Sequence, residues 1–489
     1  MRIAIIGTGT AGVSILRELV KNKNFSKMHI DAYDSTKNIG QGIPFQNDSE
    51  QLLINLPAEQ MSLNLDNKRE FFNWYEHQST FKYKHPEYLP RFLFGHYMKS
   101  FIQKYNEQFE NIHLIEQQVQ EVFIEAGIGQ TNVIYNVCTS EEIGKCKKYD
   151  VVFLTIGTMS YHDPYQLKGK KGYIHTPYPT YNTLDEVDET ERIAVVGTGL
   201  ASLDVIRYVV SHHPNLPITM TSRKGQLPSV RGEMPEVHFE HLTPVQLNQL
   251  KKEHFGNAPL EKVIKLFLKD CARYDLPIKQ LIERRVGNPI DDLTYDLNHP
   301  IELGKLQSLL ENAKENLNWI WNSLSRKDQK RFLSEYSWVL KDNSNPMPPE
   351  TARLLVDYIQ SGQIEIKSGL ENIEYDDKQF HFEFKDQQET KQQFDVVINA
   401  TGSKTQLADL DEDDQLIINM ENRQVIQAHP LGGIQILAET NQVISPRYGT
   451  LDNMYAIGQL TNGINQSRNG VTMIVKQAVN VVKHLTKNN

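Results

Sequence analysis

The sequence contains few cysteines and no long hydrophobic run. Its three cysteines are Cys138, Cys146 and Cys271, and they form neither a C-x-x-C pair nor a zinc-ligand spacing. This pattern is typical of a cytoplasmic protein, and it argues against a thiol-disulfide reductase, which needs a close redox-active pair. No run of about 18 apolar residues is present, so we expect no transmembrane helix. The chain enters an alternating strand at once, so we expect no secretory signal.

Basic residues are also scarce relative to acidic ones. The 489 residues include 52 Lys and Arg against 61 Asp and Glu, which gives a net charge of −9. Proteins that bind nucleic acids or anionic membranes hold phosphates mainly with clustered Lys and Arg. We therefore expect neither kind of partner. The length suggests about three domains, and no sequence feature indicates an oligomeric state.

We assign no catalytic or metal-binding role to two clusters of polar residues. His238 and His241 stand close together beside glutamates, but no third ligand is evident, so we expect a surface segment and no metal site. The acidic run Asp409–Asp414 predicts a solvated loop.

The most informative segment is "IAIIGTGTAGVS", which begins at Ile3. It predicts a strand over Arg2–Ile6, a glycine turn and a helix over about Ala11–Lys21, and a second strand follows at Met28–Tyr33. Asp34 comes directly after that strand. The order strand, glycine turn, helix, strand and acid is the order that a dinucleotide site requires. The glycines let the backbone approach a pyrophosphate, and the acid binds the ribose hydroxyls.

A second copy, "IAVVGTGLASLD", begins at Ile193 and differs from the first in two ways. Ser202 takes the place of the third glycine, and it is small enough for the helix to pack near the strand. The following strand ends in Ser222, Arg223 and Lys224 instead of an acid. An acid would repel a 2′-phosphate, whereas Arg and Lys bind it, so this turn favours NADPH over NADH. The alternative is that Arg223 and Lys224 belong to an ordinary solvated loop.

Each glycine turn is followed by a β-meander and by an apolar strand that ends in glycine, Gly157 in the first copy and Gly402 in the second. We therefore predict an α/β protein with two Rossmann-like dinucleotide-binding domains, β-meanders, and a helical insertion in the second domain. The "NMYAIGQLTNG" segment and the last helix return to the first domain and make it discontinuous. The predicted ranges are 1–165 with 440–489, 180–230 with 346–410, and the insertion 231–345.

Several further segments carry a resemblance to known flavoproteins. They are "GQGIPF" (Gly40–Phe45), "LLINLPAEQMS" (Leu52–Ser62), "YLPRFLFGHYM" (Tyr88–Met98), "TSRKGQLP" (Thr221–Pro228) and "NPMPPETARLL" (Asn345–Leu355). With the two turns, they resemble the bacterial FAD/NAD(P)-binding oxidoreductases of the YdhS-like group. More loosely, the chain is similar to class B and N-hydroxylating flavin monooxygenases. The resemblance implies FAD on the first turn and NADPH on the second.

The resemblance also places Asn55 and its neighbours beside the flavin ring. We expect Asn55 to be catalytic, as a polar group near the reactive edge; the alternative is that Asn55 only forms a turn, with Met61 in the core. Arg91 would hold a phosphate or a substrate carboxylate, or else form an ion pair. Gln459 stands where many such enzymes have an Asp that meets the ribityl chain. The expected cofactor-binding residues are Gly7, Gly9, Thr10, Ala11, Gly12, Asp34, Asn55, Met61, Arg91, Gly157, Gly197, Gly199, Leu200, Ala201, Ser202, Ser222, Arg223, Lys224, Gly402, Gly458 and Gln459.

FAD and NADPH in one chain imply hydride transfer from nicotinamide to flavin. We expect a monooxygenase that uses O2 and hydroxylates a small amine or amino-acid-like metabolite, with the helical insertion capping the substrate site. One alternative is a reductase or dehydrogenase without oxygen insertion. Another is a flavin-bound sensor without catalytic activity.

Overall fold

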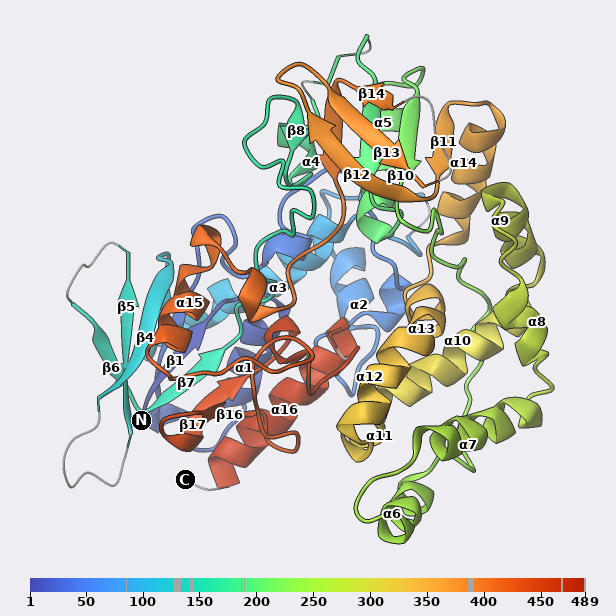
Figure 1. The fold of residues 1–489 in the computed structure, drawn as a ribbon. Helices are drawn as coiled ribbons and strands as arrows, with labels where there is room; N and C mark the ends of the chain where they lie inside the picture. The colour runs from blue at the N-terminus through green and yellow to red at the C-terminus, as the bar shows by residue number, and fades with distance from the viewer. Residues whose placement is uncertain are drawn as a thin grey trace. The chain divides into compact units, whose positions relative to one another are not determined.

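The chain divides into two compact units (Figure 1). The computed structural model describes residues 1–84, 86–125, 133–140, 145–185, 187–188, 190–385, 391–467 and 469–487. Unit 1 comprises Met1–Glu50, Leu56–Ser160 and Ser403–Asn489, and unit 2 comprises Gln51–Asn55 and Tyr161–Gly402. Among the described helices, none has the length and apolar character needed to cross a membrane.

Unit 1 is built on a six-stranded sheet in which all neighbouring strands are parallel except the edge pair β16 and β17. In sheet order the strands are β16 (Gln442–Ser445), β17 (Gly449–Ala456), β7 (Val151–Leu154), β1 (Arg2–Ile6), β2 (His29–Tyr33) and β3 (Ile112–Ile115). The runs "IAII" and "VVFL" are buried throughout because they are central strands covered on both faces. The C-terminal strand β17 lies beside β7, so this part of the chain does return to the first sheet.

Helices cover this sheet closely. The helices of unit 1 are α1 (Thr10–Val20), α2 (Glu70–Glu76), α3 (Arg91–Gln108), α15 (Gln415–Asn422) and α16 (Val471–Lys487). Helix α1 packs against both α3 and the C-terminal helix α16, although the two ends of the chain supply α1 and α16 (Figure 1). Because α1 is enclosed in this way, most of its residues are buried and few polar side chains interrupt its apolar sequence.

A three-stranded antiparallel sheet completes each unit, and here the sequence prediction needs correction. The sheets are β4 (Val119–Glu125), β5 (Ile134–Thr139) and β6 (Lys147–Tyr149) in unit 1, and β12 (Leu370–Tyr375), β13 (Phe380–Phe384) and β14 (Gln392–Phe394) in unit 2. The segments before them, "NIHLI" (Asn111–Ile115) and "GQIEIK" (Gly362–Lys367), were expected to open the meanders. They are instead β3 and β11 (Ile364–Lys367), at the edges of the large parallel sheets. Alternation does not distinguish these positions, because β3 and β11 also begin with a buried residue followed by an exposed one.

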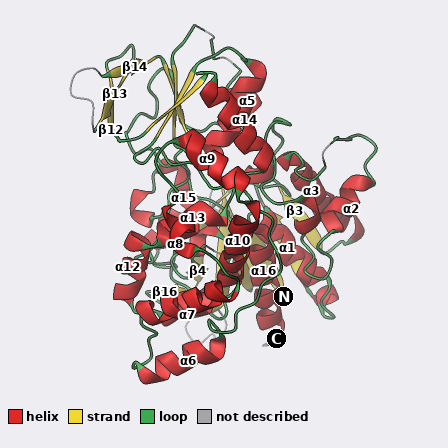
Figure 2. Cartoon of the chain, turned by 90° about the vertical axis from the view of Figure 1, so that its right-hand side faces the viewer, coloured by secondary structure: helices red, strands yellow, loops and turns green. Residues whose placement is uncertain are grey.

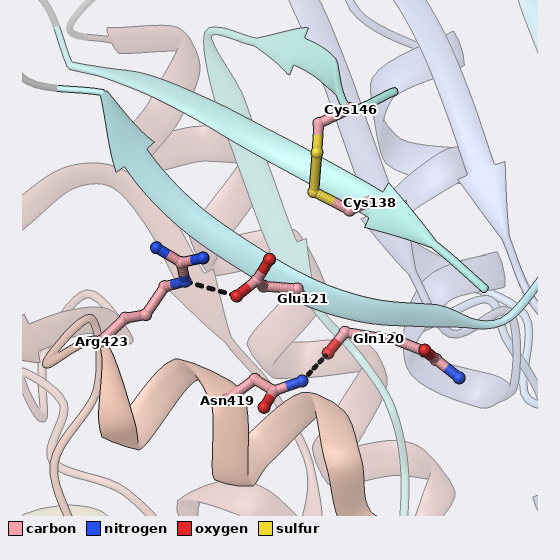
Figure 3. Close-up of a disulfide and its surroundings, with 6 residues drawn as sticks. All are labelled: Gln120, Glu121, Cys138, Cys146, Asn419 and Arg423. Carbon is pink, nitrogen blue, oxygen red and sulfur yellow. Dashed lines mark hydrogen bonds and ion pairs between the residues drawn. A yellow bond between two sulfur atoms is a disulfide. The ribbon is translucent and has the colours of Figure 1, made fainter. Parts of the chain in front are cut away.

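A disulfide joins Cys138 to Cys146 in unit 1 (Figure 3). The antiparallel register places Val137 opposite Lys147, which brings the two cysteines together with their Cα atoms 4.4 Å apart. The sequence analysis missed this pair, so the lack of a close cysteine pair no longer argues against thiol-disulfide chemistry. The third cysteine, Cys271, is buried, and burial raises the pKa of its thiol to about 12.

Unit 2 is built on a five-stranded parallel sheet. Its strands, in sheet order, are β11 (Ile364–Lys367), β10 (Ile218–Thr221), β9 (Ile193–Val196), β15 (Val396–Asn399) and β8 (Tyr173–Ile174). Helices α4 (Thr180–Thr183), α5 (Leu200–His212) and α14 (Pro349–Gln360) belong to the same unit. A single apolar core joins β9, β10 and β15 to α5 and α14, with Val195, Ile206, Met220, Leu355 and Ile398 among its buried residues.

The predicted helical insertion also belongs to unit 2, and its described residues contain helices without any strand (Figure 2). Its helices are α6 (Pro244–Glu253), α7 (Leu260–Arg273), α8 (Ile278–Glu283), α9 (Pro289–Asn298), α10 (Pro300–Glu315), α11 (Leu317–Ser323), α12 (Arg326–Glu335) and α13 (Ser337–Ser344). Two stretches that read as long helices are each divided in two, at Asn316 and at Tyr336.

The unit boundaries differ slightly from the predicted domain ranges. Residues 161–165 lie in unit 2, where the His162 N–H donates to the Gly402 carbonyl at 2.9 Å. Residues 403–410 lie in unit 1, where Lys404 pairs with Asp411 at 2.6 Å and with Asp414 at 3.6 Å. Asp414 is buried and accepts hydrogen bonds from the Ser160 N–H and hydroxyl. The acidic run is therefore not simply a solvated loop, because two of its carboxylates anchor this segment.

A buried ion pair connects α1 to α2 in unit 1. The Arg17 guanidinium donates two hydrogen bonds of 2.9 Å to the Glu70 carboxylate, and the Tyr97 hydroxyl donates a third. Arg17 also lies 3.9 Å from the ring centre of Phe101. Burial raises the pKa of Glu70, but the hydrogen bonds from Arg17 and Tyr97 outweigh burial and hold that pKa below its ordinary value.

We expect Glu70→Gln to lower the free energy of unfolding by about 1–3 kcal/mol at neutral pH, because it leaves the Arg17 charge buried without its partner. Since the folded-state pKa of Glu70 is depressed, its contribution is present above the unfolded pKa and is lost as the pH falls through the folded pKa. The difference between wild type and variant should therefore shrink in acid. Urea unfolding at neutral and acidic pH measures this. Glu76→Gln, an exposed position on the same helix, is the control; equal losses in both variants would contradict the assignment.

Candidate cofactor-binding site

At two glycines of the first glycine turn, the packing of the surrounding backbone leaves no room for a side chain. Gly7 has a φ of +95°, and a Cβ there would lie 2.4 Å from the Thr155 carbonyl oxygen. A Cβ on Gly12 would lie 2.0 Å from the Gly7 carbonyl oxygen. The Thr155 hydroxyl donates to that same Gly7 carbonyl at 2.6 Å. These contacts lock the end of β1, the end of β7 and the start of α1 together.

Gly9, in the same turn, serves a different purpose. A Cβ at Gly9 would meet only the Cα of Gly42, at 3.4 Å, which is at the edge of ordinary contact. Gly9 therefore leaves space beside the start of α1, where the first backbone N–H groups of the helix have no partner within the helix. Thr10 and Ala11 are the first residues of this helix. A gap that a side chain would fill, next to unpaired backbone donors, suits the pyrophosphate of a dinucleotide.

Asp34 stands at the end of β2, as predicted, and is held by a threonine that the sequence analysis did not identify. Its Oδ2 accepts hydrogen bonds from the Thr8 N–H at 2.6 Å and from the Thr8 hydroxyl at 2.9 Å, and its Oδ1 accepts from the Ser35 N–H. The Thr8 hydroxyl oxygen in turn accepts from the Gly40 N–H. Burial raises the pKa of Asp34, although the bonds from Thr8 and Ser35 oppose this. A carboxylate offers about four acceptor positions, and these three bonds leave about one of them for a ribose hydroxyl.

The second glycine turn has the same arrangement of strand, turn and helix, but its backbone is packed less closely. Gly197 has a φ of +129°, and a Cβ there would lie 2.5 Å from the Ala400 carbonyl oxygen. A Cβ on Gly199 would meet no atom within 4 Å, so this glycine also borders open space at the start of α5. Leu200 and Ala201 begin that helix. Ser202 is fully buried, and its hydroxyl donates to the Gly199 carbonyl at 2.6 Å, so the second turn accommodates a side chain where the first cannot.

Ser222 occupies the position in the second turn that Asp34 has in the first. The Gly7 N–H donates to the Tyr33 carbonyl and the Gly197 N–H to the Thr221 carbonyl, each at 2.8 Å, and Asp34 and Ser222 are the next residues. Thr198 then contacts Ser222, with 3.0 Å between their hydroxyl oxygens, just as Thr8 contacts Asp34. Both copies therefore place a threonine against the residue that follows the second strand, and that residue is an acid only in the first copy.

Arg223 and Lys224 are both exposed directly after Ser222. Neither side chain forms an ion pair with any residue that the structure describes. The Lys224 charge is close enough to Asp342 to oppose the rise that burial causes in the pKa of that carboxyl. Two exposed cations next to a hydroxyl are suited to bind a phosphate group.

The strands that follow each turn end in glycines with left-handed backbone, Gly157 with φ +78° and Gly402 with φ +91°. A Cβ at either position would meet no atom within 4 Å. In unit 2 the amide of Asn399, which is buried, donates to the His162 and His175 carbonyls and holds the connecting segment in place.

Gly458 and Gln459 begin a cluster of amide side chains before α16. Gly458 has a φ of +89°, and a Cβ there would meet no atom within 4 Å. The Gln459 Oε1 accepts hydrogen bonds from the amide groups of Asn462, at 2.7 Å, and Asn469, at 3.1 Å. Gln459 is thus held by neighbouring amides.

Asn55 lies in the short segment Gln51–Asn55, which belongs to unit 2 although the chain on both sides of it belongs to unit 1. Two arginines of unit 2 hold its ends. Arg207 donates to the Gln51 carbonyl at 2.8 Å, and the buried Arg231 donates to the Asn55 carbonyl from two nitrogens, at 3.1 and 2.7 Å. Burial lowers the pKa of Arg207. No sequence signal identified these arginines, because each bonds a backbone carbonyl far away in the chain.

The remaining predicted residues have less distinctive surroundings. Met61 is buried, as the core alternative requires, and lies just after a short helical turn. Arg91 is the first residue of α3 and is partly buried. In the segment that holds His238 and His241, the N–H groups of Glu240, His241 and Leu242 donate to the buried Asp270 carboxylate. The described residues contain no group of three His, Cys, Asp or Glu side chains placed to share a metal ion.

Comparison with known proteins agrees with this geometry. Residues 4–159 match the FAD-NAD(P)-binding family. Over 464 residues, 82% of this chain and 83% of the relative, the sequence is 21% identical to the uncharacterized protein YdhS of Escherichia coli K12.

Solved structures of other proteins share the fold of this chain. The chain is similar to reduced ornithine hydroxylase from Pseudomonas aeruginosa, with a TM-score of 0.62 and 12% identity, over 99% of each chain. It is also similar to ornithine N-hydroxylase from Kutzneria sp. 744 (TM-score 0.58, 12% identity) and L-lysine 6-monooxygenase from Pseudomonas syringae (TM-score 0.57, 14% identity), again over 99% of each chain. The predicted fold class and the predicted resemblance are both confirmed.

The two kinds of glycine in the first turn should respond differently to alanine. We expect Gly12→Ala to destabilise the protein by about 1–3 kcal/mol, because its Cβ overlaps the Gly7 carbonyl. Gly9→Ala should change stability by no more than about 1 kcal/mol and yet reduce bound FAD, because its Cβ enters the space for the pyrophosphate. Urea unfolding and the visible absorbance of purified protein measure the two effects. A Gly9→Ala variant that retains FAD fully would contradict this assignment.

Proposed function

We propose that the protein is an FAD-dependent, NADPH-oxidising monooxygenase that hydroxylates a small amine or amino-acid-like metabolite. The observation that carries this proposal is the pair of matching glycine turns, one ending in Asp34 and the other in Ser222, Arg223 and Lys224. The fold that contains them is shared with ornithine and lysine hydroxylases over nearly their full length.

The residues divide between the two cofactors according to their chemistry. Gly9 and the start of α1 would receive the FAD pyrophosphate, and Asp34, held by Thr8, would accept the ribose hydroxyls. Gly199 and the start of α5 would receive the NADPH pyrophosphate. Arg223 and Lys224 would bind its 2′-phosphate, to which the Ser222 hydroxyl would donate a hydrogen bond.

When bound, FAD supplies hydride acceptance from NADPH and, once reduced, the activation of O2. The protein binds and orients the reactants and controls access of water. We assign to Asn55 a hydrogen bond near the reactive edge of the flavin. Its backbone carbonyl is held by Arg231, so the side-chain amide alone is available for this role. We assign substrate selection to the helical insertion, since the two glycine turns are used by the nucleotides.

The purified protein should be yellow, and NADPH should bleach its flavin rapidly under anaerobic conditions. In air, oxygen uptake and a hydroxylated product should accompany NADPH oxidation when the substrate is present; L-ornithine and L-lysine are the first probes. NADPH oxidation with an organic acceptor but without a hydroxylated product would instead identify a reductase. A flavin that NADPH does not reduce would favour a sensor. A colourless protein that fails to take up FAD would refute the proposal.

Arg223→Ala should raise the KM for NADPH about tenfold or more and leave the KM for NADH unchanged, because only NADPH carries the 2′-phosphate. Steady-state kinetics with both nucleotides measure this. Arg353→Ala, which removes an exposed arginine on α14 of the same unit, is the control. Equal effects on both nucleotides would show that Arg223 acts on the fold instead of on the phosphate.

Asn55→Ala should reduce the hydroxylated product formed per NADPH about tenfold or more, since it removes a polar group near the reacting atoms. Flavin content should stay unchanged, because the Asn55 carbonyl still accepts from Arg231. Product yield, oxygen uptake and absorbance are measured together. Gln51→Ala, at the other end of the same segment, is the control. If Asn55→Ala formed as much hydroxylated product per NADPH as the wild type, Asn55 would only form a turn.

A further inference from the structure

A cavity of about 310 Å³ opens in unit 1 at the end of the sheet opposite the glycine turn. It is lined by Arg2, His29, Asp31, His113, Lys147 and Tyr149. Arg2 and His29 are the first residues of β1 and β2, whereas the glycine turn and Asp34 follow the last residues of these strands. The cavity is therefore separate from the dinucleotide site, at the amino ends of the parallel strands.

The lining of this cavity is predominantly cationic. Arg2 and Lys147 carry permanent positive charges, and two imidazoles stand beside them. The single carboxylate, Asp31, is 8% exposed and is occupied within the wall: it accepts from the Tyr149 hydroxyl at 2.5 Å and lies 3.1 Å from the His113 Nδ1 and 3.7 Å from the Lys147 Nζ. One negative charge thus faces two permanent positive charges.

Two of the cavity's donor groups have no partner in the part of the chain that the structure describes. The Arg2 guanidinium lies 5.4 Å from the ring centre of Tyr149 and forms no ion pair or hydrogen bond there. The His29 imidazole forms none either. An arginine offers five N–H donors in a planar arrangement that matches phosphate oxygens.

The wall that carries these groups is well anchored. Tyr149 is buried, and its hydroxyl oxygen lies 2.5 Å from that of Tyr33. Lys147 follows Cys146 directly, so the disulfide to Cys138 and the pairing of Lys147 with Val137 both restrain its backbone. His113 lies opposite Asp31 in the β2–β3 register. The cationic groups therefore project from a fixed strand framework.

We propose that this cavity binds a phosphate group, either inorganic phosphate or a small phosphate monoester. Arg2 and Lys147 provide the charged contacts, and His29 and His113 provide further hydrogen-bond donors. The cavity has room for a phosphate with a small organic substituent. The proposal does not depend on the proposed monooxygenase activity, because binding requires no turnover.

The test uses the full-length protein saturated with FAD and NADP⁺, so that the two nucleotide turns do not take up phosphate. Isothermal titration with inorganic phosphate and with glycerol 3-phosphate separates the two ligand sources. Arg2→Gln and Lys147→Gln should each weaken binding about tenfold or more, as the loss of a charge-assisted contact does. Both side chains are exposed, so thermal unfolding should confirm that the variants fold.

Lys148→Gln is the matched control. It makes the same charge change on the same strand, but Lys148 is not part of the cavity lining and pairs with Glu125 at 2.6 Å. Phosphate binding should be unchanged in this variant. If Lys148→Gln weakened phosphate binding equally, the loss of affinity would come from the change in net charge and not from this cavity, and the proposal would fail. Wild-type protein that binds neither probe at millimolar concentration would also overturn the proposal.

Discussion

In unit 1 the Gly7 carbonyl oxygen lies 2.0 Å from where a Cβ on Gly12 would be, so β1, the turn and α1 can pack together only without that side chain. The rest of the unit depends on this contact. It sets the direction of α1, against which α3 and α16 pack, and it brings the start of α1 beside the space that Gly9 leaves free. The fold of unit 1 and the candidate cofactor site therefore both depend on the close packing of Gly12 against the Gly7 carbonyl.

The two turns share one framework and differ in the residue that follows the second strand. In each, a threonine side chain contacts the residue after the second strand, Thr8 with Asp34 and Thr198 with Ser222. The backbone hydrogen bonds around that residue are also equivalent. Replacing an acid with a hydroxyl followed by two cations changes the electrostatic preference from ribose hydroxyls to phosphate and leaves the framework intact.

The segment Gln51–Asn55 is held by hydrogen bonds to its backbone instead of to its side chains. Arg207 and Arg231 donate to carbonyl groups, so the identity of the residues in the segment is not restricted by this attachment. Such an arrangement fixes the main chain of this segment within unit 2.

The sequence by itself determined both glycine turns, the strands beside them, Asp34, and Ser222 with the two cations that follow it, because the residue types and their spacing along the chain form a recognisable pattern. Only the tertiary structure decided the disulfide, the edge positions of β3 and β11, the anchoring by Asp414 and the contact of Arg231 with Asn55. Each of these joins groups whose register or partner is set by strand pairing or by a distant backbone carbonyl. The cationic cavity belongs to the second group, since four separate strands, β1, β2, β3 and β6, bring its residues together and no local pattern marks them.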